Sequence, residues 1–180
     1  MRKIASLVIF GIMVLSVLGI YASNVQQESN KEYGGFTFYP AGTGWQVKVN
    51  GAFYKFYHLP DELAEINVGQ FPLSEKIYLA YDPSEKNITA EDALFLLRSL
   101  LQQFGTRGVV SCMRELGCPG ELPIVNCNDA TAPVVYFRSA EEQRVIKQGQ
   151  CIIIQAPTSA DLGKAVEKIG YQLLGVMSNE

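Results

Sequence analysis

Four cysteines carry the most definite chemistry in this chain: Cys112, Cys118, Cys127 and Cys151. An even number of cysteines favours disulfides and an oxidising compartment. We predict the pairs Cys112–Cys118 and Cys127–Cys151. The first pair would close a short loop rich in turn residues, and the second would join two predicted strands.

Two other interpretations of the cysteines remain open at this point. Zinc sites usually take their ligands from close C-x-x-C pairs, whereas these cysteines are separated by 5, 8 and 23 residues. A redox-active pair would need a motif or a helix start that lowers a thiol pKa, and neither is apparent. The sequence therefore predicts no metal ligand and no cofactor.

A candidate ligand site follows the predicted strand over residues 76–81, which is nearly continuously apolar and ends at Asp82. In open α/β sheets, ligands bind outside the carboxyl ends of the strands. The residues that we expect there are Asp82, Asn126, Asn128, Asp129, Arg138 and Ser139. The competing interpretation is that Asp82 merely terminates its strand.

No catalytic set is evident, so we predict no catalytic residue. His58 is the single histidine, and no serine lies in a G-x-S-x-G elbow that could use it as a base. Asp61, Glu62 and Glu65 could hold a hard cation or do acid–base work. Their position at a predicted helical turn over residues 60–66 favours complementation of the helix dipole instead.

The hairpin over residues 45–57 is rich in aromatic side chains: Trp45, Phe53, Tyr54, Phe56 and Tyr57. Asn50-Gly51 divides it, which is the strongest local signal for a type I′ turn. These rings either cover one face of a sheet or form a platform for carbohydrate or a partner. Further along, Asn87-Ile88-Thr89 is a glycosylation sequon in a predicted loop.

The elements that must position these residues alternate between strands and helices. A strand over residues 35–39 precedes the hairpin, and the strand over 76–81 leads through a capping box at residues 89–92 into a helix over 93–104. That helix would bury Leu94, Leu97, Leu101 and Phe104, and Gly105 would close it. A strand that begins at Val109 would then complete a parallel βαβ unit.

The second half is rich in strands, predicted over residues 122–127, 133–138, 143–147 and 150–155. The last two flank Gln148-Gly149 as a second hairpin, and Ser159 would cap a closing helix that buries Leu162, Val166, Ile169 and Leu173. We therefore predict an α/β or α+β domain. It has a mixed β-sheet, a βαβ unit, two β-hairpins and two main packing helices, and it follows an N-terminal transmembrane or signal helix.

The N-terminus reads as an export segment. Arg2 and Lys3 precede an apolar run over residues 4–22, and no further charge occurs before Glu28. This apolar run is longer than the core of a typical signal peptide, and its length suits a membrane-spanning helix. Cleavage after the small residue Ala22 is the alternative, although Ile20 is not the small residue that a signal-peptidase site prefers two positions earlier. Residues 1–23 are therefore predicted as a signal peptide or signal-anchor helix, residues 24–34 as a polar tether, and residues 35–180 as one extracytoplasmic domain.

The net charge of the chain argues against one class of partner. The net charge of the chain is −3, and it is −5 once the two leader cations Arg2 and Lys3 are set aside. An acidic domain argues against nucleic acid, which requires a basic surface. The sequence favours a tethered or exported domain with a binding or structural role at the cell envelope. It would contact the membrane through its N-terminal helix and have a protein or an envelope glycan as partner. The alternatives are an extracytoplasmic hydrolase with its site around Asp82, and a thiol oxidoreductase.

Overall fold

The computed structural model describes residues 29–85 and 90–178. The predicted leader over residues 1–23 lies outside these residues, as do the glycosylation candidate Asn87 and Thr89 of the predicted capping box; the N-cap of the helix that follows is Ala90, which makes no side-chain capping bond. The compact unit begins at Lys31, so residues 31–34 of the predicted tether belong to it. In the described part of the chain, no helix combines the length and the apolar character that a membrane span requires.

The first four strands form an antiparallel sheet in chain order. They are β1 (Lys31–Tyr33), β2 (Phe36–Pro40), β3 (Trp45–Val49) and β4 (Ala52–Phe56). The Asn50-Gly51 hairpin is confirmed: both residues have positive φ, of 49° and 87°, as a type I′ turn requires. The short 3-10 helix η1 (Pro60–Leu63) follows where one or two helical turns were predicted.

The second sheet contains five strands in the order β6-β5-β7-β9-β8. Its strands are β5 (Lys76–Tyr81), β6 (Arg107–Cys112), β7 (Val134–Ser139), β8 (Arg144–Gln148) and β9 (Cys151–Ala156). The βαβ unit is confirmed, since β5 pairs in parallel with β6 after the helix α2 (Glu91–Gln103). The hairpin of β8 and β9 is confirmed as well, with antiparallel pairing.

Of three further predictions of the fold, one is confirmed in part and two are wrong. The predicted mixed sheet is present as the five-stranded sheet, whereas β1 to β4 form a separate antiparallel sheet. The strand predicted over residues 122–127 does not form, because the chain between Pro119 and Pro123 is a turn and only Ile124 bridges to Cys112. Finally, Thr158 rather than Ser159 caps the closing helix α3 (Ser159–Leu173), because its Oγ1 accepts the N–H of Asp161 at 3.2 Å.

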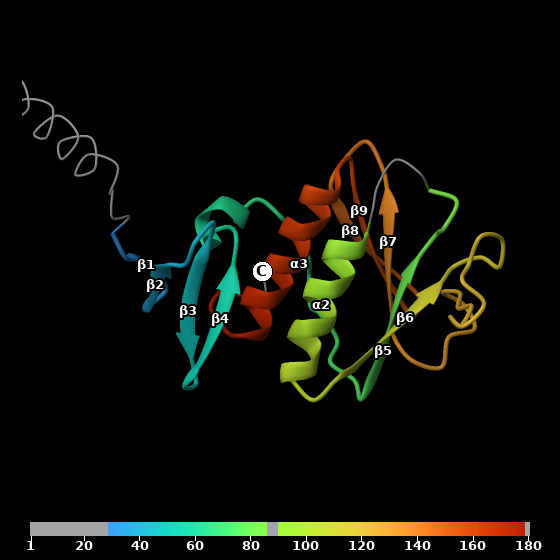
Figure 1. Ribbon diagram of the computed structural model, residues 1–180, viewed down its shortest axis with the longest axis horizontal. Coiled ribbons are helices and arrows are strands. Elements are labelled where there is room, and N and C mark those ends of the chain that lie inside the picture. The colour runs from blue at the N-terminus through green and yellow to red at the C-terminus, as the bar shows by residue number, and fades with distance from the viewer. Residues whose placement is uncertain (1–28, 86–89, 179–180) are drawn as a thin grey trace, which may run out of the picture. The chain divides into compact units, whose positions relative to one another are not determined.

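The two helices lie between the two sheets (Figure 1), so the domain has three layers. Tyr171 of α3 packs against Phe56 and Phe38 of the four-stranded sheet, with ring centroids 4.0 and 5.9 Å apart. Buried side chains on the opposite side of the helices come from the five-stranded sheet, including Leu79 and Phe137. One main core therefore spans all three layers.

The other face of the five-stranded sheet is covered by the long connection between β6 and β7. Val125 of this connection packs on a smaller cluster with Val134 and Ile153. Because both faces of the sheet are covered, every residue of β9 is buried. The continuous apolar run over residues 152–154 suits a strand covered on both faces.

Candidate functional site

A crevice of about 420 Å³ opens at the carboxyl end of β5, beside the first turns of α2. The strand β5 pairs in parallel with β6 on one side and with β7 on the other, so the direction of the connections reverses at β5. Such a switch point is the usual place for a ligand in an open α/β sheet. The side chains that line the crevice are mostly apolar, among them Tyr81, Leu94, Phe95, Val110 and Phe137.

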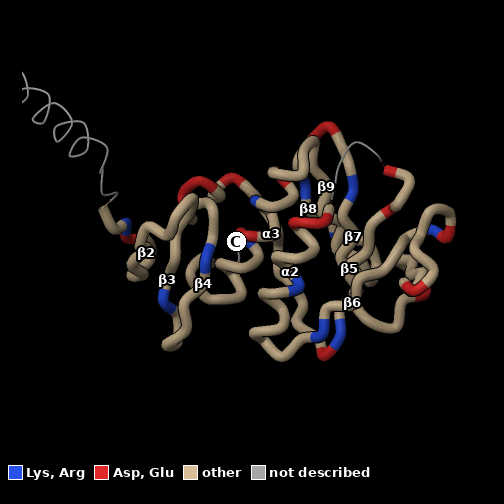
Figure 2. The backbone as a smooth tube through the Cα atoms, in the orientation of Figure 1, with Lys and Arg blue, Asp and Glu red and all other residues tan. Residues whose placement is uncertain are grey.

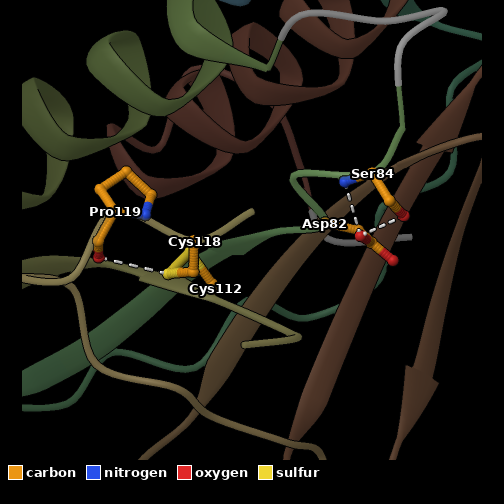
Figure 3. Close-up of a disulfide and its surroundings, with 5 residues drawn as sticks. All are labelled: Asp82, Ser84, Cys112, Cys118 and Pro119. Carbon is orange, nitrogen blue, oxygen red and sulfur yellow. Dashed lines mark hydrogen bonds between the residues drawn. A yellow bond between two sulfur atoms is a disulfide. The ribbon is translucent and has the colours of Figure 1, made fainter. Parts of the chain in front are cut away.

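Asp82 lines this crevice, but its carboxylate is already committed to the protein. Oδ1 accepts the N–H of Ser84 at 2.9 Å and its Oγ–H at 2.7 Å, and Oδ2 lies 2.7 Å from Nε of Arg114. Figure 3 shows Asp82 and Ser84 near the Cys112–Cys118 disulfide. Burial alone would raise the pKa of Asp82, but the bonds from Ser84 and the charge of Arg114 lower it below its usual value. Asp82 is therefore an ionised structural group.

Glu85 ties the loop after β5 to the end of β7. Its Oε2 accepts the N–H of Ser139 at 2.6 Å, and its Oε1 accepts the hydroxyl of Tyr136 at 3.2 Å. Burial, together with the charges of Glu85 and Asp82, raises the pKa of Tyr136 to about 12. No local pattern indicated these contacts, because they join residues more than fifty positions apart.

The six residues of the predicted ligand site fall into two groups. Asp82, Arg138 and Ser139 lie at the carboxyl ends of β5 and β7, as expected. There the guanidinium of Arg138 donates to Oε1 of Gln155 on β9, with Nε at 3.0 Å. Of these three residues, Asp82 lines the crevice.

Asn126, Asn128 and Asp129 lie at the opposite end of the sheet. Their segment is tethered through Cys127 to Cys151, the first residue of β9. Oδ1 of Asn126 accepts the N–H groups of Asn128 and Asp129 at 3.0 and 2.9 Å, which makes a local side-chain-capped turn. The prediction placed these residues near Asp82 because it assumed that they follow a strand. In the structure they belong to a turn at the end of the sheet where β9 begins.

Both predicted disulfides are present, Cys112–Cys118 and Cys127–Cys151. In the part of the chain that the structure describes, no cysteine is free and no group of three potential metal ligands occurs. The zinc interpretation is therefore wrong for these four thiols, because none of them is available as a thiolate. The two disulfides are consistent with an oxidising, extracytoplasmic location.

The acidic residues after β4 have a local structural role. Asp61 and Glu62 lie in the first turn of η1, where negative charge complements the helix dipole. Oε2 of Glu62 also accepts the N–H of Leu59 at 2.6 Å, which satisfies a backbone donor before the helix.

His58 has a partner that the sequence did not indicate. Its Nδ1 lies 2.9 Å from Oε2 of Glu167, a residue of α3 that is only 1% exposed. The same carboxylate accepts the N–H groups of Tyr57 and His58 at 2.8 and 3.0 Å. The hydroxyl of Tyr171 donates to the carbonyl of His58 at 2.6 Å. These bonds join the end of β4 to α3, so His58 serves as a structural joint.

Residues of the crevice that sequence reasoning missed come mainly from one side of α2. Glu91, Phe95 and Arg98 recur at helical spacing beside Leu94. The available signal was Phe95, a large aromatic residue off the predicted apolar stripe of this helix.

In comparisons with known proteins, the chain matches no family model, no curated protein and no solved structure, so its function must be inferred from its own residues and geometry.

Proposed function

We propose that the chain is a non-catalytic binding domain, tethered or exported at the cell envelope. An apolar side chain of a partner protein would enter the crevice, and basic residues of the partner would flank that side chain. The observation that carries this proposal is the combination of an apolar crevice at the carboxyl ends of the strands with a large exposed ring at its rim. A contact of this kind resembles the anchor-in-pocket centre of protein interfaces.

The rim of the crevice is more apolar than an ordinary surface requires. Phe95 is 74% exposed, although a helix surface gains nothing by presenting a phenyl ring to water. Leu116, on the Cys112–Cys118 loop, is 82% exposed. That loop reaches the crevice wall, because a Cβ added at Gly117 would lie 3.4 Å from Cβ of Pro83. Phe95 in the lining and Leu116 on the adjoining loop are thus both exposed apolar side chains, which supports a protein partner.

The charges of the lining favour a basic partner modestly. Arg114 pairs with Asp82, which leaves Glu85 and Glu91 against Arg98. The described residues of the lining therefore carry a net charge of −1, on a domain that is acidic as a whole. Complementary charge of this size contributes more to orientation and association rate than to affinity.

The lining residues support binding over hydrolysis. The described residues around the crevice include no serine, cysteine, histidine or lysine. Asp82 accepts three short contacts and is held ionised, so it lacks the free position that a general base needs toward a substrate. A hydrolase centred on Asp82 remains the alternative, and the same experiment addresses it.

Panning of a random peptide library on phage against the full chain tests the proposal. We expect enriched peptides to carry an aromatic or large aliphatic residue beside Lys or Arg. Phe95→Ser should weaken their binding about tenfold, because one anchor contact contributes about 1–2 kcal/mol. The matched control is Phe53→Ser, which removes an exposed ring from the other sheet and should leave binding unchanged.

Failure of enrichment, or equal binding by wild type and Phe95→Ser, would refute the proposed site. Mass spectrometry of the enriched peptides after incubation with the protein addresses the hydrolase. Cleavage that Asp82→Asn abolishes without a change in melting temperature would replace the binding proposal with the hydrolytic one.

A further inference from the structure

The four-stranded sheet presents a second surface, on the side away from the helices. Because successive strand residues point to opposite faces, Phe38, Val47 and Phe56 point into the core and are buried. The alternate residues of the strands point outward, and the exposed Tyr57 directly follows the last residue of β4. We call the following set the aromatic face: Tyr39, Gln46, Lys48, Phe53, Lys55 and Tyr57.

The rings on the aromatic face are open to solvent. Tyr39 is 38% exposed, and Phe53 and Tyr57 are each 59% exposed. Three large aromatic residues on one flat surface are more than a small sheet needs for its own stability, since its core residues lie on the other face. Tyrosines combine a flat apolar ring with a hydroxyl, a combination enriched at recognition surfaces.

The strand register places hydrogen-bonding and cationic groups between the rings. Tyr39 pairs with Gln46, and Gln46 pairs with Lys55, so these three side chains form one row across β2, β3 and β4. Lys48 pairs with Phe53, and its Nζ lies 5.6 Å from the centre of that ring. The Nζ of Lys55 lies beside the turn at Gly42, 3.9 Å from where a Cβ there would be. The result is a strip of alternating rings and ammonium groups.

The charge of this segment is opposite to that of the chain. No carboxylate occurs between Glu32 and Asp61, although the chain has 18 acidic residues and a net charge of −3. The strands β2 to β4 carry lysines alone among charged residues (Figure 2). An anionic partner would therefore meet no carboxylate over β2 to β4; on the outward side of the same sheet, Glu32 of the edge strand β1 lies opposite Thr37.

We propose that the aromatic face binds an acidic polysaccharide, with sugar rings on Tyr39 and Tyr57 and carboxylates on Lys48 and Lys55. Sugar C–H groups suit the exposed rings, Gln46 can both donate to and accept from sugar hydroxyls, and ammonium–carboxylate contacts are charge-assisted hydrogen bonds. This site is separate from the proposed function at the crevice, and its test uses different residues.

An anionic membrane surface is the rival occupant. Two lysines supply only about 1 kcal/mol each toward anionic lipid, which is weak for adhesion without a deeply inserted apolar element. Glutamine and tyrosine hydroxyl groups gain little from lipid, whereas each can bond a sugar hydroxyl. The mixed chemistry of the face therefore favours the glycan.

Isothermal titration of the full chain with oligogalacturonate is the direct test, with neutral dextran as the reference glycan. We expect oligogalacturonate alone to bind, and binding to weaken with salt because the ammonium groups are exposed. Tyr57→Ala should weaken binding about tenfold through the loss of one stacking contact, and the double variant Lys48→Gln/Lys55→Gln should weaken it about a hundredfold because it removes two charge-assisted contacts. Lys147→Gln, an exposed lysine on β8, is the matched control and should bind as wild type does.

All substituted side chains are exposed, so melting temperatures close to that of wild type are expected and verify the fold. The proposal fails if oligogalacturonate does not bind, or if Lys147→Gln weakens binding as much as the double variant does. It also fails if the chain binds phosphatidylglycerol vesicles through Lys48 and Lys55 but not the oligosaccharide, which would assign the face to lipid.

Discussion

Outside the crevice, the side chain of Glu167 joins the end of β4 to α3. Its buried carboxylate accepts two backbone N–H groups and faces the imidazole of His58. Together with burial, it also raises the pKa of Tyr171, whose hydroxyl bonds to the carbonyl of His58. A buried carboxylate without these partners would be strongly destabilising, so the sheet and the helix depend on each other at this point.

Glu167→Ala should therefore lower the free energy of unfolding by about 3 kcal/mol, because it leaves the buried N–H groups of Tyr57 and His58 without an acceptor. Glu167→Gln should lose less, since its amide oxygen can still accept one of these bonds. Urea unfolding at neutral pH measures both. Glu142→Ala is the control, because it removes an exposed ion pair with Arg144 worth at most about 1 kcal/mol. Equal stability of Glu167→Ala and Glu142→Ala would contradict the structural role.

At the scale of secondary-structure elements, α3 lies between two sheets and therefore has close neighbours on both sides. Its second half is buried almost all round, including the polar residues Glu167, Lys168 and Gln172. The closest approach is at Gly170, where an added Cβ would lie 2.9 Å from side-chain atoms of both Leu100 and Phe56. One turn from its start, Gly163 has open space in the corresponding position.

The two glycines therefore predict opposite effects of the same substitution. Gly163→Ala should raise the free energy of unfolding by about 0.5–1 kcal/mol, because alanine favours the helix and meets no neighbour. Gly170→Ala should lower it by about 1 kcal/mol or more, because overpacking against Leu100 and Phe56 outweighs the helical preference. Thermal or urea unfolding of the two variants side by side gives the answer. Stabilisation by both would show that the layers can move apart at Gly170.

Elements specified by local sequence were predictable. The Asn50-Gly51 turn, the strand over residues 76–81 and the helix α2 follow from positive φ, continuous apolarity and helical spacing within short windows. Both disulfide pairs were also predicted, although the strand over residues 122–127 that supported the second pairing does not form.

Features that depend on contacts between distant segments were not predictable. The separation into two sheets follows from the helices lying between them, and no local pattern encodes that position. The partnership of His58 with Glu167 joins residues 109 positions apart. For the candidate site, Asp82 was found because it ends a buried strand, whereas Phe95 and Arg98 required the orientation of α2 on the sheet.

At the scale of the whole molecule, the disulfides hold the long connection between β6 and β7 on the five-stranded sheet. Cys112–Cys118 closes a loop at the carboxyl end of β6, and Cys127–Cys151 fastens the returning chain to the start of β9. The connection has few elements of regular structure, so covalent links replace the backbone pairing that would otherwise order it.

Replacement of each pair by alanine should destabilise the domain in proportion to the logarithm of the loop length. The sequence separations are 6 and 24 residues. Loop-closure entropy then predicts a loss of about 2.4 kcal/mol for Cys112→Ala/Cys118→Ala and about 3.5 kcal/mol for Cys127→Ala/Cys151→Ala. Urea unfolding of both double variants checks the order. A larger loss for the shorter loop would mean that packing of Cys112, not the closed loop, is decisive.

The position of the second disulfide also divides the maturation of the chain in time. The main core between the sheets contains no cysteine, so it can consolidate without any thiol chemistry. The small cluster of Val125, Val134 and Ile153 on the far side needs its cover secured by Cys127 and Cys151. Before this disulfide forms, the cover is not fixed covalently. The apolar cluster beneath it can then be exposed on a domain whose main core is already folded. Before its disulfides form, the domain is therefore expected to be more prone to aggregation than the oxidised molecule.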